Sequence, residues 1–310
     1  MKILFTGASS FTGFWFVKTL AAAGHELICP VTANLVDYAE LRLWRVEQLK
    51  AVCRLVPQAP FGSENFLKLI RENRFDVLCH HAAEVRNYKS PDFDAGRALQ
   101  NNTQNLRAVL TALKPRGLKA VCFTGSVFEP DEGTGDEPLR AFSPYGLSKA
   151  LTFQFFRYYC FEAGVALGKF VIPNPFGPCE EPRFTAYLMR TWREGKPAEV
   201  KTPDYVRDNI HVDLLAAVYS QFVQQFGESK TGYVRINPRG YVGKQGEFAQ
   251  RVAQETRTRL GWTCELKLSP QEDFSEPLSR ANTEPAGKLV PQWNEAAAWD
   301  AFANFYSAKP

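Results

Sequence analysis

The feature that most constrains this chain is a regular alternation of apolar β-type runs with helical stretches over its first 175 residues. Six runs are predicted strands (residues 2–6, 26–31, 51–56, 75–80, 119–124 and 165–172) and three stretches are predicted helices (residues 11–23, 94–113 and 145–162). Strands that are apolar throughout, with helices between them, indicate a parallel sheet covered on both faces. Right-handed crossovers then make this an α/β fold with a doubly wound parallel sheet.

A glycine-rich turn follows the first predicted strand and precedes the first helix. It reads Gly7-Ala-Ser-Ser-Phe-Thr-Gly13, with Ser10 where a GxxGxxG pattern has its middle glycine. Such a turn lets the backbone approach a pyrophosphate, and the helix N-terminus faces its charge. The order of strand, turn and helix predicts a dinucleotide site over Gly7, Ser9, Ser10, Phe11, Thr12 and Gly13. A tight turn without a ligand is the alternative.

The segment at the end of the second predicted strand, residues 29–34, contains no acidic residue. A carboxylate at this place binds the adenosine ribose hydroxyls and would repel a 2′-phosphate. Arg42 or Arg45 would supply positive charge for such a phosphate. We therefore expect NADP in preference to NAD, the alternative being that both arginines are exposed helix residues.

A phenol and an ammonium, those of Tyr145 and Lys149, stand four residues apart at the start of a predicted helix. This spacing puts both on one face, where the ammonium favours the phenolate and lowers the tyrosine pKa. Such a tyrosine can act as the acid or base in a hydride transfer. Thr124 and Ser126 end the fifth strand, at the sheet edge where ligands bind, and Thr124 would hydrogen-bond the reacting oxygen. A capping or turn role is the alternative for either hydroxyl.

Six motifs along the chain resemble those of the extended short-chain dehydrogenase/reductase family, the NAD-dependent epimerase/dehydratase group. In order they are TGASSFTG, HHAA (residues 80–83), FTGSVF, PYGLSK, NPFGP (residues 174–178) and RDNIHVDLLA (residues 207–216). The resemblance covers nearly the whole chain. That group has a Rossmann sheet and includes UDP-galactose 4-epimerase, dTDP-glucose 4,6-dehydratase and reductases of nucleotide-linked 4-keto-6-deoxy sugars.

The resemblance also implies roles for individual residues. Tyr145 would be the acid/base, Lys149 would bind the nicotinamide ribose, and Thr124 would match the family's Ser/Thr. The cofactor site would further contain Thr32, His81, Ala82, Ala83 and Pro173. The substrate site would contain Val85, Arg86, Asn87, Ser126, Asn174, Arg207 and Arg280, with both arginines gripping the pyrophosphate. Asn101 resembles a structural asparagine of the family, with Asn102 as the other possible register.

Departures from the family pattern indicate the subclass. Gly125 and Ser126 follow Thr124 where dehydratases have two carboxylic residues, so a dehydratase is not expected. The segments around NPFGP and RDNIHV look most like C4 reductases of deoxysugar pathways such as CDP-abequose synthase. The predicted function is NAD(P)H-dependent reduction of the C4 keto group of a nucleoside-diphosphate 4-keto-6-deoxy sugar. A C4 epimerase with tightly bound NAD is the alternative, and a non-catalytic cofactor-sensing regulator is a lesser one.

The composition changes after Pro173, because prolines and aromatic residues become frequent. This change predicts a second part of the molecule. Residues 1–175 are expected to form the dinucleotide-binding Rossmann domain, to which residues 205–240 return. Residues 176–204 and 241–310 are expected to form a small C-terminal substrate-binding lobe. Elements predicted here are helices at 211–226 and 246–259 and a strand at 232–236. With 310 residues, 45% of them hydrophobic, the chain can build a core of this size.

Composition limits the partners. A net charge of +4 without a dense Lys/Arg tract does not indicate nucleic-acid binding, and no run of 18 apolar residues predicts a membrane span. The seven cysteines lack a CxxC pair, which predicts reduced thiols in a cytoplasmic protein without a metal site. His80 and His81 point to opposite faces of a strand and cannot chelate one metal. Aromatic residues around the helix at 145–162 predict a homodimer, or packing by the C-terminal lobe.

Overall fold

A seven-stranded parallel sheet is the largest sheet of the computed structural model, which describes residues 1–228 and 232–308. Its strands are β1 (Lys2–Thr6), β2 (Glu26–Pro30), β3 (Arg54–Val56), β4 (Val77–His80), β5 (Ala120–Ser126), β7 (Ala166–Ile172) and β11 (Tyr233–Ile236). They are ordered β11-β7-β5-β4-β1-β2-β3, and every neighbouring pair is parallel. The chain winds outward from β1 in both directions, which confirms the doubly wound α/β fold.

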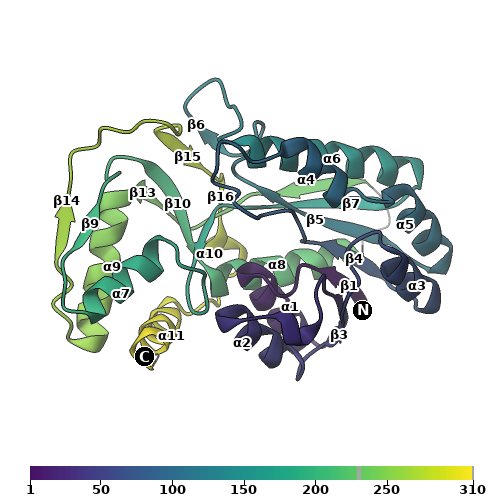
Figure 1. Ribbon diagram of the computed structural model, residues 1–310, viewed down its shortest axis with the longest axis horizontal. Helices are drawn as coiled ribbons and strands as arrows, with labels where there is room; N and C mark the ends of the chain where they lie inside the picture. Colours follow the sequence, from purple (N-terminus) through teal and green to yellow (C-terminus); the bar gives the residue numbers. More distant parts are fainter. Residues whose placement is uncertain (229–231, 309–310) are drawn as a thin grey trace. The chain divides into compact units, whose positions relative to one another are not determined.

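Helices cover both faces of this sheet (Figure 1). They are α1 (Phe11–Ala22), α2 (Glu40–Leu49), α3 (Glu64–Glu72), α4 (Ala95–Asn102), α5 (Leu106–Leu113), α6 (Pro144–Glu162) and α8 (Val212–Gly227). Side chains of α3, α5 and α6 share one apolar cluster with β1, β4 and β5. On the opposite face, Phe16 of α1 stacks on Tyr219 of α8, and both rings contact Phe170 of β7. These two layers bury the central strands.

The helix expected over residues 94–113 is in fact two helices, α4 and α5. The break lies at Asn105, which has a left-handed backbone (φ 53°) and donates from its side chain to the Gly62 carbonyl oxygen at 2.8 Å. Thr103 is the C-cap of α4, and its hydroxyl donates to the Leu99 carbonyl oxygen at 2.7 Å. Short polar side chains that bond backbone groups compete with helix continuation, and asparagine tolerates the left-handed region. The helices α2 and α3 were not anticipated.

The chain separates into two units. Unit 1 comprises residues 1–132, 140–172 and 216–237, and unit 2 comprises residues 133–139, 173–215 and 238–310. The last segment of unit 1 begins at Ala216, inside α8, and so is shorter than the 205–240 stretch expected from the sequence. Pro173, directly after β7, is the first residue of its segment in unit 2.

Unit 2 has a five-stranded sheet of its own. Its strands are β6 (Thr134–Gly135), β8 (Asn174–Phe176), β10 (Val206–His211), β13 (Tyr241–Lys244) and β15 (Ser279–Ala281), in the order β13-β10-β15-β6 with β8 also paired to β10. Two small parallel pairs join β12 (Pro238–Arg239) to β16 (Glu284–Pro285) and β14 (Leu266–Leu268) to β9 (Ala198–Val200). Short 3-10 turns occur at Leu35–Asp37 and Lys114–Arg116 in unit 1.

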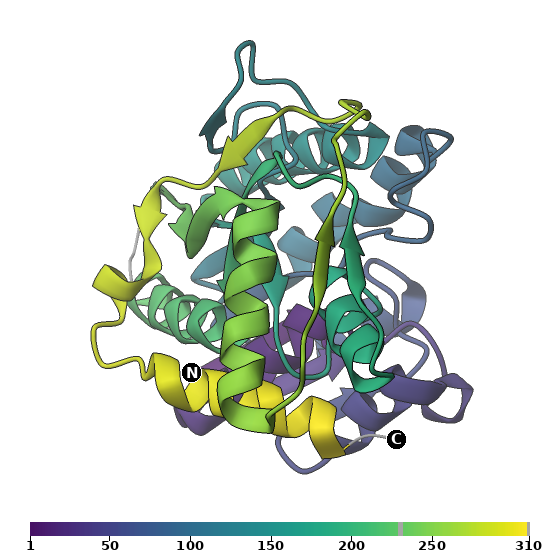
Figure 2. The same cartoon turned by 90° about the vertical axis from the view of Figure 1, so that its left-hand side faces the viewer.

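The helices of unit 2 enclose an aromatic core. They are α7 (Phe184–Arg193), α9 (Gln245–Leu260), α10 (Ala286–Leu289) and α11 (Glu295–Ala308). Phe176 is at the centre of this core and contacts Phe248 of α9 and Trp299 and Phe302 of α11. Figure 2 shows α9 and the yellow C-terminal α11 crossing near one end of α9. Within residues 1–228 and 232–308, every helix is too short or too polar to cross a membrane.

Candidate active site

The turn between β1 and α1 is packed so closely that two positions require glycine. Gly7 has a left-handed backbone (φ 82°), and a Cβ there would lie 2.8 Å from the Ala82 amide nitrogen. A Cβ on Gly13 would overlap the Gly7 carbonyl oxygen. Only glycine fits both places without moving the backbone. The tight turn between strand and helix that the sequence indicated is therefore present, and its binding of a phosphate stays a prediction.

Ser10, which replaces the middle glycine, completes the turn. Its hydroxyl accepts a hydrogen bond from the Gly13 amide at 3.1 Å and donates to the Gly7 carbonyl at 2.9 Å. It is thus the N-cap of α1, whose positive end and early amide groups suit an anion. Phe11, Thr12 and Gly13, the first three residues of α1, are buried. These features fit a dinucleotide pyrophosphate.

Two guanidinium groups of α2 reach Ser9 in the same turn. Arg42 donates to the Ser9 hydroxyl from Nε at 3.2 Å and from Nη2 at 3.0 Å, and its guanidinium lies over the Tyr38 ring. Arg45, which is buried, donates from Nε to the Ser9 carbonyl at 3.1 Å. Thr32 is exposed just beyond β2. Arg42 is thus an exposed residue of α2 whose guanidinium reaches the turn, whereas Arg45 is buried against it.

His81 connects this turn to Thr124. Its Nδ1 lies 3.1 Å from the Thr124 hydroxyl, and its Nε2 lies 3.0 Å from Thr12 Oγ1 and 3.2 Å from Ser10 Oγ. Burial, with a smaller contribution from Lys149, lowers the pKa of His81 to about 3. The imidazole is thus neutral and links the start of α1 to the end of β5. The sequence suggested a cofactor-site residue here but not this bridge.

Neighbouring residues of the same motif have distinct places. The amides of His81 and Ala82 both donate to Thr6 Oγ1 at 3.1 Å, which holds Ala82 against Gly7. Ala83 follows and is half-buried. His80 points to the opposite face of the sheet, where its ring contacts Phe61 and Phe156. The expected opposite orientation of the two histidines is present.

Lys149 and Thr124 are brought together by α6 and β5. Lys149 donates from Nζ to the Thr124 carbonyl oxygen at 2.6 Å and lies over the Phe123 ring. Burial lowers the pKa of Lys149 to about 8; Glu129 opposes this shift and Lys169 adds to it. Lys149 is therefore a buried cation fixed beside the end of β5.

Tyr145 lies one helical turn before Lys149. Ser143 caps α6 by accepting from the Gly146 amide at 3.4 Å, and Pro144 and Tyr145 are the first two helical residues. The Tyr145 ring contacts the rings of Tyr88, Phe93 and Phe128, with centroids 5.3, 6.0 and 6.4 Å away. The aromatic surroundings orient the phenol, and Tyr88 and Phe93 were not anticipated from the sequence.

Other predicted residues have less distinctive surroundings. Val85, Arg86 and Asn87 are exposed in the loop after β4, and Asn87 has a left-handed backbone (φ 57°). Ser126 is buried at the end of β5, where its hydroxyl accepts from the Phe128 amide at 3.2 Å. A role for these residues in substrate binding stays a prediction.

Asn102, not Asn101, is the buried asparagine of α4. Its Oδ1 accepts from the Glu84 amide at 2.8 Å, and its Nδ2 donates to Thr152 Oγ1 at 3.3 Å. Asn101 is exposed and bonds only the Glu84 carboxylate, at 3.4 Å, among the described contacts. The sequence could not decide between the two asparagines, because adjacent residues of a helix point about 100° apart. Only the packing of α4 shows that Asn102 is the one that faces inward.

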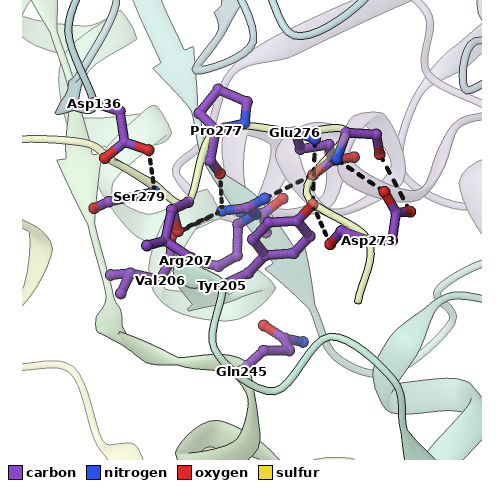
Figure 3. A network of polar contacts seen from close by, with 12 residues as sticks. Asp136, Tyr205, Val206, Arg207, Gln245, Asp273, Glu276, Pro277 and Ser279 are labelled. Atoms are coloured by element: carbon purple, nitrogen blue, oxygen red, sulfur yellow. Dashed lines mark hydrogen bonds and ion pairs between the residues drawn. The ribbon is translucent and has the colours of Figure 1, made fainter. Parts of the chain in front are cut away.

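The predicted substrate residues of unit 2 lie on its own sheet. Arg207 of β10 forms an ion pair with Glu276 (Nη2 to Oε2, 2.7 Å), and its Nη1 donates to the carbonyls of Val206 and Pro277, both at 3.0 Å (Figure 3). Its guanidinium also lies over the Tyr205 ring. Arg280 of β15 is the register partner of Arg207. Two cations therefore occupy paired positions on neighbouring strands, and their binding of a diphosphate stays a prediction.

Asn174 also belongs to this sheet. It begins β8, and its Nδ2 donates to the Asp208 carbonyl of β10 at 3.2 Å. Asp208 in turn accepts from the amides of Gly240 and Asn282 at 2.8 and 3.1 Å. The Asn174 side chain thus takes part in holding strands together, a contact that its sequence motif did not suggest.

Comparisons with known proteins agree with this architecture. The model of the family described as "NAD dependent epimerase/dehydratase" matches residues 3–235, well over half of the chain. The chain is 29% identical over 177 residues to the UDP-glucose 4-epimerase of Azospirillum brasilense. That match covers 54% of this chain and 46%, less than half, of the relative.

Solved structures share the fold. The UDP-glucuronic acid 4-epimerase of Bacillus cereus has a TM-score of 0.77 at 17% identity, covering 99% of each chain. The UDP-glucose 4-epimerase of Thermus thermophilus, in complex with NAD, has a TM-score of 0.75 at 19% identity over all of both chains. The dTDP-glucose 4,6-dehydratase of Streptomyces venezuelae, with NAD bound, has a TM-score of 0.73 at 19% identity, covering 99% of this chain and 97% of that one.

Proposed function

Since this chain belongs to the NAD dependent epimerase/dehydratase family, a group of NAD-dependent enzymes within the extended short-chain dehydrogenases/reductases, we propose that it reduces a nucleotide sugar. The proposed reaction is reduction of the C4 keto group of a nucleoside-diphosphate 4-keto-6-deoxy sugar, with NADPH preferred to NADH. In this proposal unit 1 binds the dinucleotide and carries the chemistry, and unit 2 binds the nucleotide sugar.

The proposed chemistry uses three side chains of unit 1. The nicotinamide, when bound, supplies the hydride. Tyr145 donates its phenolic proton to the C4 oxygen, and the Lys149 ammonium stabilises the phenolate that remains. Thr124 hydrogen-bonds the same oxygen, while the neutral His81 orients the Thr124 hydroxyl. Lys149 keeps its position through the Thr124 carbonyl.

The observation that carries the cofactor preference is the pair of guanidinium groups at Ser9. Arg42 and Arg45 both donate to this residue, and residues 29–34, at the end of β2 and just beyond it, contain no carboxylate to repel a 2′-phosphate. A planar guanidinium suits a phosphate because it offers two parallel N–H donors. An enzyme selective for NADPH exchanges its cofactor in each turnover, which favours a reductase.

Carboxylates around Thr124 do not suit an elimination of water. Gly125 and Ser126 follow it directly, and the next carboxylate along the chain is Glu129. One Glu129 oxygen accepts from the Ser126 amide and the other from Lys169. Both oxygens are therefore occupied in the protein interior, so we do not propose a dehydratase.

A C4 epimerase with retained NAD is the second candidate. It is favoured by the sequence match to a UDP-glucose 4-epimerase. An epimerase would use the same Tyr145, Lys149 and Thr124 but would return the hydride to the opposite face of the keto sugar. A non-catalytic cofactor sensor would have no use for the buried Lys149 beside Thr124.

The experiment that separates these functions is absorbance at 340 nm with NADPH and then NADH, against a panel of nucleotide-linked 4-keto-6-deoxy sugars. The proposal expects stoichiometric oxidation of NADPH with one member of the panel. Unchanged absorbance, together with NAD carried through purification and a C4-inverted product from a nucleotide hexose, would replace the reductase with the epimerase.

The Arg42→Ala variant is expected to raise the Kd for NADPH by about tenfold, because a charge-assisted hydrogen bond contributes on the order of 1.5–3 kcal/mol. The Kd for NADH should change much less, since NADH has no 2′-phosphate. Titration of protein fluorescence with each cofactor gives both constants. The matched control is Lys50→Ala, which removes a cation at the other end of the same helix. Equal losses for both cofactors in Arg42→Ala would mean that this guanidinium only supports the turn.

Arg207 and Glu276 are expected to act in opposite directions on nucleotide-sugar binding. The Arg207→Ala variant should raise the Kd for a nucleoside diphosphate by about tenfold or more, since it loses charge-assisted contacts. The Glu276→Gln variant should lower it, because the carboxylate that pairs with Arg207 competes with the diphosphate. Isothermal titration with CDP, UDP and dTDP measures both, and NADPH affinity should not move in either. Weaker binding in Glu276→Gln would show that the pair orders the site instead.

We also propose that the protein is a cytoplasmic homodimer. Phe155, Tyr158 and Phe161 of α6 are 43%, 59% and 82% exposed. Aromatic side chains this exposed on one long helix suit contact with a second copy of the chain. Sedimentation velocity of the wild type and of Phe161→Glu tests the oligomeric state.

A further inference from the structure

Three buried charged side chains lie together beside the end of β5 in unit 1. Lys169 Nζ of β7 is 2.6 Å from Glu129 Oε2 and 2.7 Å from Glu132 Oε1, and none of the three side chains is more than 4% exposed. We call these residues the Lys169 cluster. Lys169 is the one charged residue in the strand sequence ALGKFVI. Buried ion pairs of this kind add little net stability, which raises the question of what else the cluster does.

The cluster is attached to the backbone of β5 through Glu129. Its Oε1 accepts the Ser126 amide hydrogen at 2.7 Å, and its own amide donates to the Ser126 carbonyl at 3.1 Å. A side chain at Gly125 would collide with this arrangement, since a Cβ there would lie 2.7 Å from Lys169 Cε and 3.0 Å from Glu129 Oε1. Glycine at this position therefore lets the cluster touch the strand.

The same short stretch of β5 is also contacted by Lys149 of α6. Lys149 donates to the Thr124 carbonyl, two residues before the amide that Glu129 holds. We propose that Glu129, paired with Lys169, is a positioning residue that fixes the Thr124–Ser126 end of β5 and balances the charge around Lys149. This inference rests on the proposed function, in which Lys149 acts with Tyr145.

The groups that face Lys149 come from several elements. Burial lowers the pKa of Lys149 most, the Glu129 carboxylate raises it, and the Lys169 ammonium lowers it. His80 and His81, at the end of β4, are neutral because burial lowers the pKa of each. Tyr145 precedes Lys149 on α6 itself. Glu129 and Lys169 are thus charged neighbours with opposite effects on the protonation of Lys149.

Because Glu129 and Lys169 have opposite effects on the Lys149 pKa, their removal should shift this pKa in opposite directions. In Glu129→Gln the pKa of Lys149 should fall, and in Lys169→Gln it should rise, each by on the order of one unit. The full chain labelled with 13C at lysine Cε is titrated by NMR, and Lys149→Met identifies the resonance. The readout needs neither substrate nor turnover. Shifts of the same sign in both variants, or no shift in either, would overturn the proposal.

The matched control is Glu132→Gln. It removes a carboxylate from the same Lys169, whereas the carboxylate that accepts from the Ser126 amide of β5 belongs to Glu129. Its effect on the Lys149 pKa should be much smaller than that of Glu129→Gln. An equal effect would mean that the whole Lys169 cluster, and not Glu129 in particular, balances the charge around Lys149. Because glutamine keeps hydrogen-bonding groups, folding is expected. If Glu129→Gln fails to fold, the rise in Lys169→Gln decides the proposal.

Kinetics supply the second readout. On raising the pH, kcat of Glu129→Gln should decline earlier than in the wild type, and that of Lys169→Gln later, because a neutral Lys149 no longer stabilises the phenolate left on Tyr145. The KM for the nucleotide sugar should stay the same, whereas general loosening would change it. If the NMR shifts have opposite signs but no substrate is reduced, the proposed function fails and the charge balance stands. If reduction occurs without those shifts, only the present inference fails.

Discussion

Tyr145→Phe is expected to lower kcat by about 10²- to 10⁴-fold, the range that positioned acid or base groups contribute. The phenylalanine ring keeps the contacts with Tyr88 and Phe93, so the shape of the site persists while the transferable proton is lost. The Kd for NADPH should stay within about twofold of the wild type, since the proposed role of the hydroxyl is proton transfer and Tyr145 lies outside the Gly7–Gly13 turn. Steady-state kinetics at 340 nm and cofactor titration measure the two effects.

The control for this substitution is Tyr159→Phe, which removes a phenolic hydroxyl from the same helix, well over three turns beyond Tyr145. Its kcat should equal that of the wild type. Turnover by Tyr145→Phe within a factor of ten of the wild type would remove Tyr145 from the acid/base role. A parallel collapse of cofactor binding would instead mean that the phenol organises the site.

Gly13→Ala is expected to destabilise the fold by about 1–3 kcal/mol and to abolish most dinucleotide binding, since overpacking a tight interior costs that much. The added methyl group overlaps the Gly7 carbonyl, so the turn must open and the first turn of α1 must shift. The Ser10 cap on the Gly13 amide would be lost in the same movement. Urea unfolding gives the free-energy change, and fluorescence titration with NADPH gives the affinity.

Gly96→Ala is the matched control, also in the first turn of a helix of unit 1. A Cβ on Gly96 meets only Asp94 Oδ1, at an ordinary 3.5 Å. Replacing an unstrained helical glycine by alanine stabilises proteins by about 0.4–1 kcal/mol. The two variants should therefore differ in sign. Equal unfolding free energies for both would show that the β1–α1 turn has more room than the structure indicates.

The sheet could be predicted from the sequence because its signal is local. Each of β1, β5 and β7 is a largely apolar run next to a helical segment, and burial on both faces needs no knowledge of neighbouring strands. The same reasoning failed where a contact between residues far apart in the sequence determines the local structure. The break between α4 and α5 depends on the bond from Asn105 to Gly62, two residues that the sequence separates by 43 positions.

The candidate site likewise combines features that local sequence predicts with contacts that only packing reveals. The four-residue spacing placed Tyr145 and Lys149 on one face of α6, and the Gly7–Gly13 turn needed only its order after a strand. The contact between Lys149 and the Thr124 carbonyl follows from the packing of α6 on β5, so no local pattern could reveal it. The choice of Asn102 over Asn101 also came from packing. The lone lysine in ALGKFVI was the one available sign of a buried charged partner.

The amino-acid sequence by itself determined the doubly wound sheet, the Gly7–Gly13 turn and the Tyr145–Lys149 spacing, because strand and helix periods and glycine requirements act over a few residues. The tertiary structure alone decided which partners the charged groups have: the uncharged Ser9 for Arg42 and Arg45, Glu276 for Arg207, and Glu129 for Lys169. A buried charge must be paired wherever the fold places it, and its partner is chosen by strand order and helix packing rather than by distance along the chain.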